Sequence, residues 1–161
     1  MSEEKRRELT MVVFSGDMDK LMAAFLIATG AAASDMNVTM FFTFYGLRAL
    51  KKKNVRTGKS FFGKMMGMME GGDISKASPS KYSMGGMGRW IFNKMMGAKN
   101  VQSLEELRKM AIDLGVNLYG CQMTMDVFEI PREKMIDEVK DVVGVAFMLE
   151  HSKDSFSTLF I

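Results

Sequence analysis

The sequence predicts a small α/β fold with a doubly wound, mainly parallel sheet of four or five strands and helices on both faces. Three observations favour this class. Short apolar runs alternate with longer segments that have helical spacing. The runs are continuously apolar, as expected of parallel strands buried on both sides. The length of 161 residues matches the usual size of one domain, so we expect a single domain over 1–161.

The first elements are a strand, a helix and a second strand. Residues 9–14 (LTMVVF) form a short apolar run that predicts a buried strand. Residues 18–33 have helical spacing and are apolar on nearly all sides, which is typical of a helix buried between layers or between subunits. Residues 38–45 (VTMFFTFY) are rich in aromatic and β-branched side chains and predict the second strand.

The second half contains one strongly marked helix and several shorter elements. Ser103 and Glu106 have the spacing of a capping box, so we expect a helix that ends near Gly115. Residues 116–120 predict a third strand, and residues 142–145 are too short to assign. The remaining expectations are a short helix over 122–128, a helical segment from Pro131 to about 139, a helix over 146–153 and a closing strand over 156–161.

An insertion at about 56–99 interrupts this alternation. It holds eight of the 19 Met residues and most of the Gly residues. Between Arg48 and Asn100 there are twelve Lys or Arg against two acidic residues, although the whole chain carries only +3. Such asymmetry is typical of an interaction surface, and a stretch of this length is usually a lid, a binding element or a mobile insertion. We expect two short helices joined by a flexible Ser/Pro turn.

The scarcity of cysteine and histidine excludes several classes of protein. One Cys and one His provide neither an internal disulfide nor the four ligands of structural zinc, so we predict no metal and no cofactor. The charged N-terminus lacks the apolar core of a secretory signal. The longest nearly apolar run, 21–33, is shorter than the roughly 20 residues of a membrane span. We therefore expect a cytoplasmic protein.

Cys121 is the leading candidate for chemistry. It directly follows a predicted strand and precedes a predicted helix, at the edge where doubly wound sheets bind ligands. Backbone N–H groups at a helix start would favour the thiolate. Gly120 would allow a tight turn, and Thr124 would bond to the sulfur or cap the helix. Cys121 equally fits the usual role of a free cysteine as a small buried apolar residue.

Residues after the first two strands would support such a site. Ser15, Gly16 and Asp17 follow the first strand, and Phe44 and Tyr45 end the second, so all five are expected near the edge that carries the cysteine. The first loop lacks the glycine patterns of dinucleotide and P-loop sites. We therefore expect no nucleotide there.

Two segments of the sequence carry a family resemblance. They are VNLYGCQMTMDVF, which contains the cysteine, and the ending VVGVAFMLEHSKDSFSTLFI. The stretch 120–124 and the turn 144–146 are their most specific parts. Together with the insertion that precedes the cysteine, they resemble the DsrE/DsrF-like family over nearly the whole chain. Members are small α/β proteins that relay sulfur, and the branch with a long Met/Gly-rich insertion is the most similar.

The resemblance implies that Cys121 carries sulfur as a persulfide and exchanges it with donor and acceptor proteins. It also implies a homo-oligomer, often a trimer or a multiple of three. Some members of this branch carry a second cysteine, which this sequence lacks. A disulfide cycle within one chain is therefore excluded, and a resolving thiol would come from a partner. We predict a sulfur carrier or sulfurtransferase.

Other interpretations stay open. Cys121 and His151 would form a nucleophilic pair if they met in space. The insertion, with Phe61, Phe62 and Trp90 beside basic residues, would suit a non-enzymatic module that docks on an acidic protein or lies peripherally on an anionic membrane. No nucleic-acid motif accompanies the charge, so we expect no nucleic acid. Its methionines would form an adaptable surface or, as soft ligands, a copper(I) site. They are Met65, Met66, Met68, Met69, Met84, Met87, Met95 and Met96.

Overall fold

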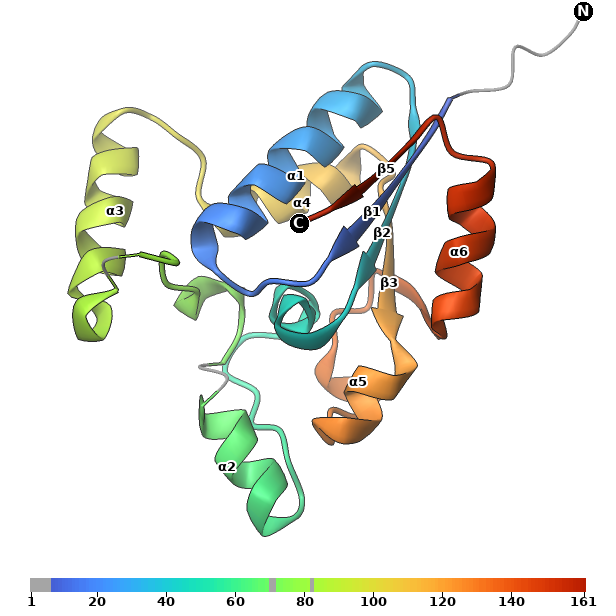
Figure 1. Ribbon diagram of the computed structural model, residues 1–161. Helices are drawn as coiled ribbons and strands as arrows, with labels where there is room; N and C mark the ends of the chain where they lie inside the picture. The colour runs from blue at the N-terminus through green and yellow to red at the C-terminus, as the bar shows by residue number, and fades with distance from the viewer. Residues whose placement is uncertain (1–6, 70–71, 82) are drawn as a thin grey trace, which may run out of the picture.

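A computed structural model, which describes residues 7–69, 72–81 and 83–161, shows a five-stranded sheet in the order β4-β3-β2-β1-β5 (Figure 1). Neighbouring strands pair in parallel throughout this sheet. The strands are β1 (Glu8–Val13), β2 (Asn37–Phe42), β3 (Asn117–Cys121), β4 (Val139–Val143) and β5 (Ser157–Phe160). The predicted α/β class with a parallel sheet is therefore confirmed.

Helices cover both faces of the sheet. On one face α1 (Met18–Ala33) and α4 (Leu104–Asp113) lie side by side, and on the other lies α6 (Val145–Lys153) (Figure 1). The main core, beneath α1 and α4, contains the fully buried side chains of Phe25, Met40 and Leu107. A smaller cluster on the α6 face contains Val12 and Phe41. Because β1 and β2 are buried on both faces, their sequences are continuously apolar.

The first helix has one buried face rather than a buried circumference. Leu21, Phe25 and Ala28 are fully buried against the sheet and α4. Leu26 and Ile27 are 52% and 40% exposed. Burial of this helix between layers of a single chain is therefore wrong, whereas burial between subunits stays a prediction. Among the described residues, none covers the outer face of α1 at Leu26 and Ile27.

Two predicted element boundaries are wrong for physical reasons. β2 ends at Phe42 because Phe44 adopts a left-handed backbone, with φ of 45°, and begins the 3-10 helix η1 (Phe44–Leu50). The segment from Pro131 makes only one 3-10 turn, η4 (Arg132–Lys134). The backbone N–H of Ile136 then donates to the Leu50 carbonyl, which draws the chain away from a helix and toward β4.

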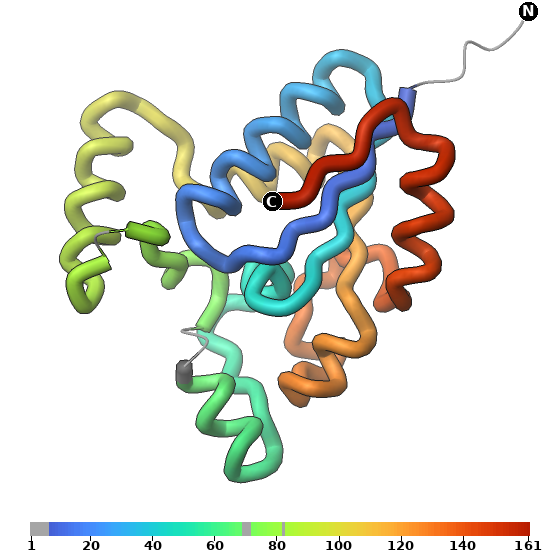
Figure 2. The backbone as a smooth tube through the Cα atoms, viewed as in Figure 1, coloured from blue at the N-terminus to red at the C-terminus, as the bar shows by residue number. Residues whose placement is uncertain are grey.

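The insertion contains the two expected helices and two short turns. These elements are α2 (Phe61–Met69), η2 (Ile74–Lys76), η3 (Met84–Gly86) and α3 (Met87–Ala98). Figure 2 shows α2 and α3 projecting away from the layer of strands, one from each side of η2. Among the residues with a described structure, no helix is long and apolar enough to cross a membrane. A single domain over 1–161 stays a prediction.

The α4 helix begins with the predicted capping box. The Glu106 N–H donates to Ser103 Oγ at 3.3 Å, and the Ser103 N–H donates to Glu106 Oε2 at 2.7 Å. Leu104 and Leu107 then place the buried face of the helix against the core. Two N–H groups of the first turn, which have no partner within a helix, are satisfied in this way.

Replacing the capping serine should weaken the fold measurably. We expect Ser103→Ala to lower the free energy of unfolding by about 1 kcal/mol, because an N–H of the first turn loses its acceptor. Urea unfolding followed by circular dichroism measures this change. Gln102→Ala, one residue outside the box, is the matched control. Equal losses in the two variants would show that the box contributes nothing.

Candidate functional site

Cys121 lies at the carboxyl end of the sheet, in an apolar environment. It is the last residue of β3 and the N-cap residue of α5 (Gln122–Val127). Its side chain is only 5% exposed and clusters with Val12 and Phe41. The partly buried side chains packed against this cluster are Tyr119, Val143 and Met148. The thiol therefore lies on the α6 face of the sheet, almost entirely buried.

The histidine belongs to a separate aromatic stack on α6. The His151 ring centroid lies 4.1 Å from that of Phe147, and His151 Nδ1–H donates to the Phe147 carbonyl at 3.1 Å. The Tyr119 ring centroid lies 4.6 Å from that of Phe147 and 6.4 Å from that of His151. Over the described parts of the chain, no hydrogen bond joins His151 to Cys121. The structure therefore does not form the Cys–His pair that the sequence left open.

Tyr119 is the titratable group nearest to the thiol along β3. Burial raises the pKa of its phenol, and the negative charge of Asp141 raises it further. The phenol consequently stays neutral near pH 7. It therefore offers the cysteine neither a base nor a positive charge.

Thr124 joins α5 to the end of β2 instead of contacting the sulfur. Its buried hydroxyl lies 3.1 Å from Thr43 Oγ1 and accepts a hydrogen bond from the Phe44 N–H at 3.2 Å. Among the described residues, the hydroxyl makes neither of the two alternative contacts expected for it, a bond to the sulfur or a cap of α5. The hydroxyl instead stabilises the left-handed turn at Phe44, which ends β2.

Gly120 has a packing role rather than a turn role. It lies within β3, so the tight turn expected at this position is absent. A Cβ at Gly120 would lie 3.4 Å from Met125 Sδ and 3.6 Å from Leu47. The glycine therefore lets α5 and η1 pack closely on the face of β3 that is opposite the thiol.

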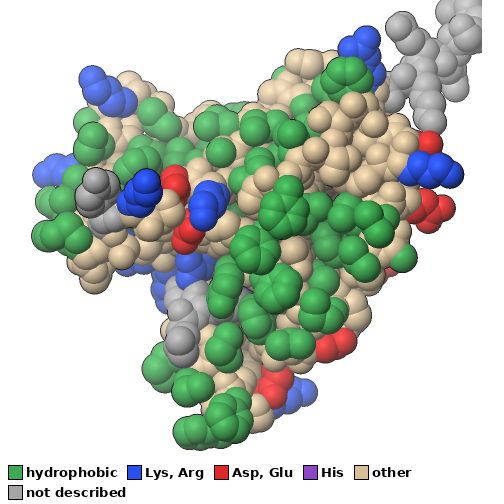
Figure 3. Space-filling view, viewed as in Figure 1, with side chains coloured by type: hydrophobic (Ala, Val, Ile, Leu, Met, Phe, Trp, Pro, Cys, Tyr) green, Lys and Arg blue, Asp and Glu red, His purple; other side chains and the backbone are tan. Residues whose placement is uncertain are grey.

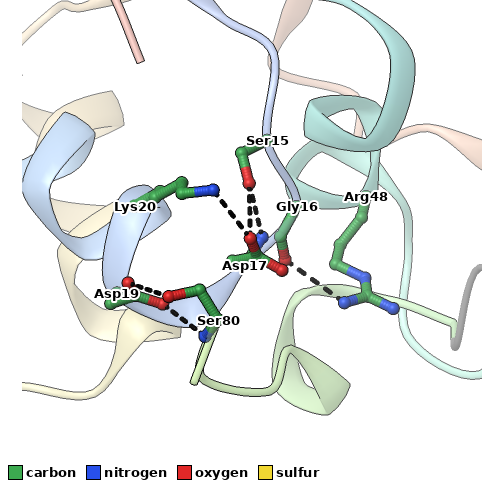
Figure 4. A network of polar contacts seen from close by, with 7 residues as sticks. All are labelled: Ser15, Gly16, Asp17, Asp19, Lys20, Arg48 and Ser80. Atoms are coloured by element: carbon green, nitrogen blue, oxygen red, sulfur yellow. Dashed lines mark hydrogen bonds and ion pairs between the residues drawn. The ribbon is translucent and has the colours of Figure 1, made fainter.

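The first loop lies at the same edge as Cys121, with β2 between β1 and β3. The Ser15 hydroxyl donates to Asp17 Oδ2 at 3.0 Å and accepts from the Asp17 N–H at 3.1 Å (Figure 4). Arg48 Nη1 donates to the Gly16 carbonyl at 3.2 Å. A Cβ at Gly16 would lie 2.5 Å from the Tyr45 carbonyl oxygen, so this close approach requires glycine. The loop thus joins β1 to η1 and does not contact the thiol.

The start of α1 also holds the insertion. The Asp19 carboxylate accepts hydrogen bonds from the Ser80 N–H at 2.8 Å and the Ser80 hydroxyl at 2.7 Å (Figure 4). Burial by itself would raise the pKa of Asp19, but the bonds from Ser80 outweigh it and lower the pKa. The Met18 N–H donates to the Ser78 carbonyl at 2.9 Å. Residues 78–80 are therefore fixed to the first turn of the helix.

Phe44 and Tyr45 belong to an aromatic surface beside the site. The Phe44 ring lies 5.6 Å from Phe14, which lies 5.8 Å from Phe160, and Tyr45 lies 6.0 Å from Phe128. Phe160 is the most exposed of these side chains, at 71%. Figure 3 shows hydrophobic side chains gathered over the ends of β1 and β5. The edge that carries Cys121 is therefore apolar on the outside as well.

Sequence reasoning missed Glu129, which connects α5 to α2. Its carboxylate accepts hydrogen bonds from the Lys59 N–H, the Ser60 N–H at 2.8 Å and the Ser60 hydroxyl at 2.6 Å. The bonds from Ser60, and then that from Lys59, lower the pKa of Glu129. Cys121 is the N-cap of α5, and Glu129 lies two residues beyond the end of that helix. Glu129 therefore links the helix that follows the cysteine to the start of α2. No local signal identifies Glu129, because Ser60 is 69 residues away.

The methionines of the insertion point in different directions. Met96 is buried and Met66 packs against the main core, whereas Met65 and Met68 are exposed. The side chain of Met69 lies outside the described residues. Within the described part of the chain, no three His, Cys, Asp or Glu side chains form a group that could hold a metal ion.

Removing the Thr124 hydroxyl should destabilise the edge of the sheet. We expect Thr124→Val to lower the free energy of unfolding by about 1–3 kcal/mol, because the isosteric side chain leaves Phe44 N–H and the Thr43 hydroxyl without a partner. Urea unfolding measures the loss. Thr124→Ser retains the hydroxyl and should recover most of the stability. If Thr124→Ser is as unstable as Thr124→Val, the methyl group rather than the hydroxyl matters.

The contact between Glu129 and Ser60 should depend on pH. The folded-state pKa of Glu129 lies below its ordinary value of 4.5. The contact is therefore complete above that value and is lost as the pH falls through the lower folded pKa. We expect the NMR amide signals of Lys59 and Ser60 to shift in this acidic range.

At neutral pH, Glu129→Gln should accelerate amide hydrogen exchange in α2 and leave exchange in β1 unchanged. The change removes the ionised acceptor while it keeps the size of the side chain. Glu133→Gln, in η4, is the matched control. Unchanged exchange in α2 of the Glu129 variant would mean that the helix is held by other contacts.

Comparisons with known proteins agree with this fold. The model of the DsrE/DsrF/DrsH-like family matches residues 5–160. The chain is 41% identical to the uncharacterized protein YrkE of Bacillus subtilis, with all of both chains covered. It is 33% identical to the sulfur carrier protein DsrE2 of Allochromatium vinosum, with 98% of this chain and 99% of the relative covered.

Solved structures show the same architecture at low sequence identity. The ychN protein from E. coli matches with a TM-score of 0.56 and 9% identity, over 96% of this chain and 99% of that one. MTH1491 from Methanobacterium thermoautotrophicum matches with a TM-score of 0.55 and equal coverage. At this identity the likeness concerns the fold alone. With a family model that spans nearly the whole chain and curated relatives of the same length, this chain belongs to the DsrE/DsrF/DrsH-like family.

Proposed function

We propose that this protein is a sulfur carrier that holds sulfane sulfur as a persulfide on Cys121 and passes it to a thiol of a partner protein. The observation that carries the proposal is the position of the chain's single cysteine, at the end of β3 where α5 begins. Membership of the family, and the 33% identity to a protein named as a sulfur carrier, support a role in sulfur relay.

The chemistry consists of two thiolate exchanges that conserve atoms and electrons. In the first, Cys121 Sγ attacks the sulfane sulfur of a donor persulfide, a new S–S bond forms, and the donor leaves as a thiolate. In the second, an acceptor thiolate attacks the outer sulfur of the Cys121 persulfide, and Cys121 leaves as a thiolate. Neither exchange needs a cofactor or an external reductant. Because the chain has no second cysteine, the persulfide has no thiol within its own chain with which to form a disulfide.

The environment of Cys121 suits a carrier better than an exposed reagent. Val12 and Phe41 bury the side chain, so water and free thiols have little access to a sulfur held there. Val143 and Met148, which pack against this cluster, are only partly buried, so a partner thiol would approach the sulfur by displacing them. Transfer would then require a protein that fits the apolar edge of the sheet, and we propose donor and acceptor proteins of this kind.

The proposal extends to a sulfurtransferase activity and a homo-oligomer in the cytoplasm, with a trimer or a multiple of three expected. Leu26 and Ile27 on α1 support contacts between copies because they are large, apolar and exposed. Size-exclusion chromatography with light scattering determines the number of chains. A monomer would remove this part of the proposal and leave the chemistry of Cys121 untouched.

Mass spectrometry tests the carrier role directly. After incubation with inorganic polysulfide, we expect the wild-type chain to gain about 32 Da, the mass of one sulfur atom, and to lose it on addition of dithiothreitol. Cys121→Ser should gain nothing. Met123→Leu, an exposed neighbour on α5, should gain sulfur as the wild type does. A wild-type chain that gains no mass would rule out the carrier role. An equal gain of mass in Cys121→Ser would also rule it out.

A further inference from the structure

The α2 helix packs on the molecule through Gly63, Gly67 and Met66, and it leaves Phe61, Phe62 and Met68 exposed. A Cβ at Gly67 would lie 2.6 Å from the Thr57 carbonyl oxygen, and one at Gly63, a turn earlier, would overlap the Glu129 carboxylate. The backbone of α2 therefore lies directly on its neighbours. This packing fixes which side of the helix faces the molecule and which side faces away.

The outer side of α2 is strongly apolar. Phe61 and Phe62 are 78% and 70% exposed, and their rings meet edge to face with centroids 5.6 Å apart. Met68 is 83% exposed. Among the residues that the structure describes, none buries these two adjacent aromatic rings and this thioether. Exposed apolar clusters of this kind mark contact sites.

The α3 helix presents a second apolar surface within the insertion. Trp90 and Met95 are 62% and 63% exposed, whereas Met96 alone among the helix residues is buried. Lys94 Nζ lies 5.0 Å from the centre of the Trp90 ring. Figure 3 shows hydrophobic side chains at the free end of α2 and along α3, with basic side chains beside those of α3. Each apolar surface therefore belongs to a helix that projects from the layer of strands.

Basic residues outnumber acidic ones around both helices, although Glu129 contacts the start of α2 and Glu70 follows its last residue in the sequence. Residues 56–69 and 83–99 contain no Asp or Glu. Lys59 and Lys64 belong to the first stretch, and Arg89 and Lys94 to the second. Asp73, between the stretches, is buried and accepts hydrogen bonds from Ser75 and the Asn54 N–H, so it does not offset this charge at the surface.

We propose that α2 and α3 form a peripheral docking surface for an anionic lipid bilayer. Aromatic and aliphatic side chains flanked by Lys and Arg are the composition of helices that lie at the boundary between headgroups and acyl chains. Both helices project from the body of the molecule, where the surface of a bilayer can reach their exposed side chains. Neither helix is long enough to span, so both lie at the surface.

This surface is separate from the cysteine site. The cluster around Cys121 contains residues of β1 to β4 and α6 and none from 56–99. Docking through α2 and α3 would hold the chain at a membrane while the aromatic edge near Cys121 stays available to partner proteins. The inference therefore goes beyond sulfur carriage and is tested independently of it.

Vesicle binding by the full chain provides the test. The probes are phosphatidylcholine vesicles with and without phosphatidylglycerol. Trp90 is the only tryptophan, so its emission reports on α3 alone. We expect cosedimentation and a blue shift of the Trp90 emission with the anionic vesicles only, both reduced at high salt. The double variant F61S/F62S should bind about tenfold more weakly, because binding scales with the apolar area inserted.

Matched variants distinguish binding through this surface from nonspecific hydrophobic binding to vesicles. Phe156→Ser removes an equally exposed ring, 67% accessible, outside the insertion and should bind as the wild type does. Cys121→Ser should also bind normally, whatever happens to sulfur carriage. If F61S/F62S unfolds, as judged by circular dichroism, K64E/K94E provides the second test and should abolish binding. Absence of cosedimentation would overturn the proposal, as would unchanged binding in the folded variants. A Trp90 shift with soluble polyglutamate but not with vesicles would assign the surface to an acidic protein instead.

Discussion

Burial of the central strands on both faces is the constraint on which the remaining structure depends. β1 and β2 are covered by α1 and α4 on one face and by the cluster beneath α6 on the other. Strands of this kind run parallel, with long connections that return the chain across a face of the sheet. All carboxyl ends consequently meet at one edge. Cys121, the loop after β1 and the turn at Phe44 lie together there for that reason.

Polar contacts from this edge also determine where the insertion lies. Asp19 holds Ser80, and Glu129 holds Ser60, so two carboxylates fix the insertion at two separate points. One carboxylate follows β1 and the other follows α5, which begins at Cys121. The insertion is therefore attached to both sides of the candidate site although none of its residues packs on the thiol.

Local patterns predicted the elements whose structure depends on local interactions. The apolar run of β1, the bounds of α1 and the capping box at Ser103 all follow from residues within a few positions of one another. The position of Cys121 after a strand was predictable in the same way. Phe44 and Pro131 were misassigned because distant contacts decide them: Thr124 holds the turn at Phe44, and Leu50 draws the chain after Pro131 toward the sheet. Single-sequence patterns contain no information about such partners.

In α2, the residues that anchor the helix to the fold differ from the residues that form its exposed apolar surface. Gly63 and Gly67 anchor the helix through backbone and carboxylate contacts, so Phe61, Phe62 and Met68 contribute nothing to the core. Substitutions on the outer face therefore change what the surface recognises at little cost in folding free energy. A lineage could redirect this segment to a new target by exchanging a few exposed side chains, while the sheet and its cysteine stay as they are.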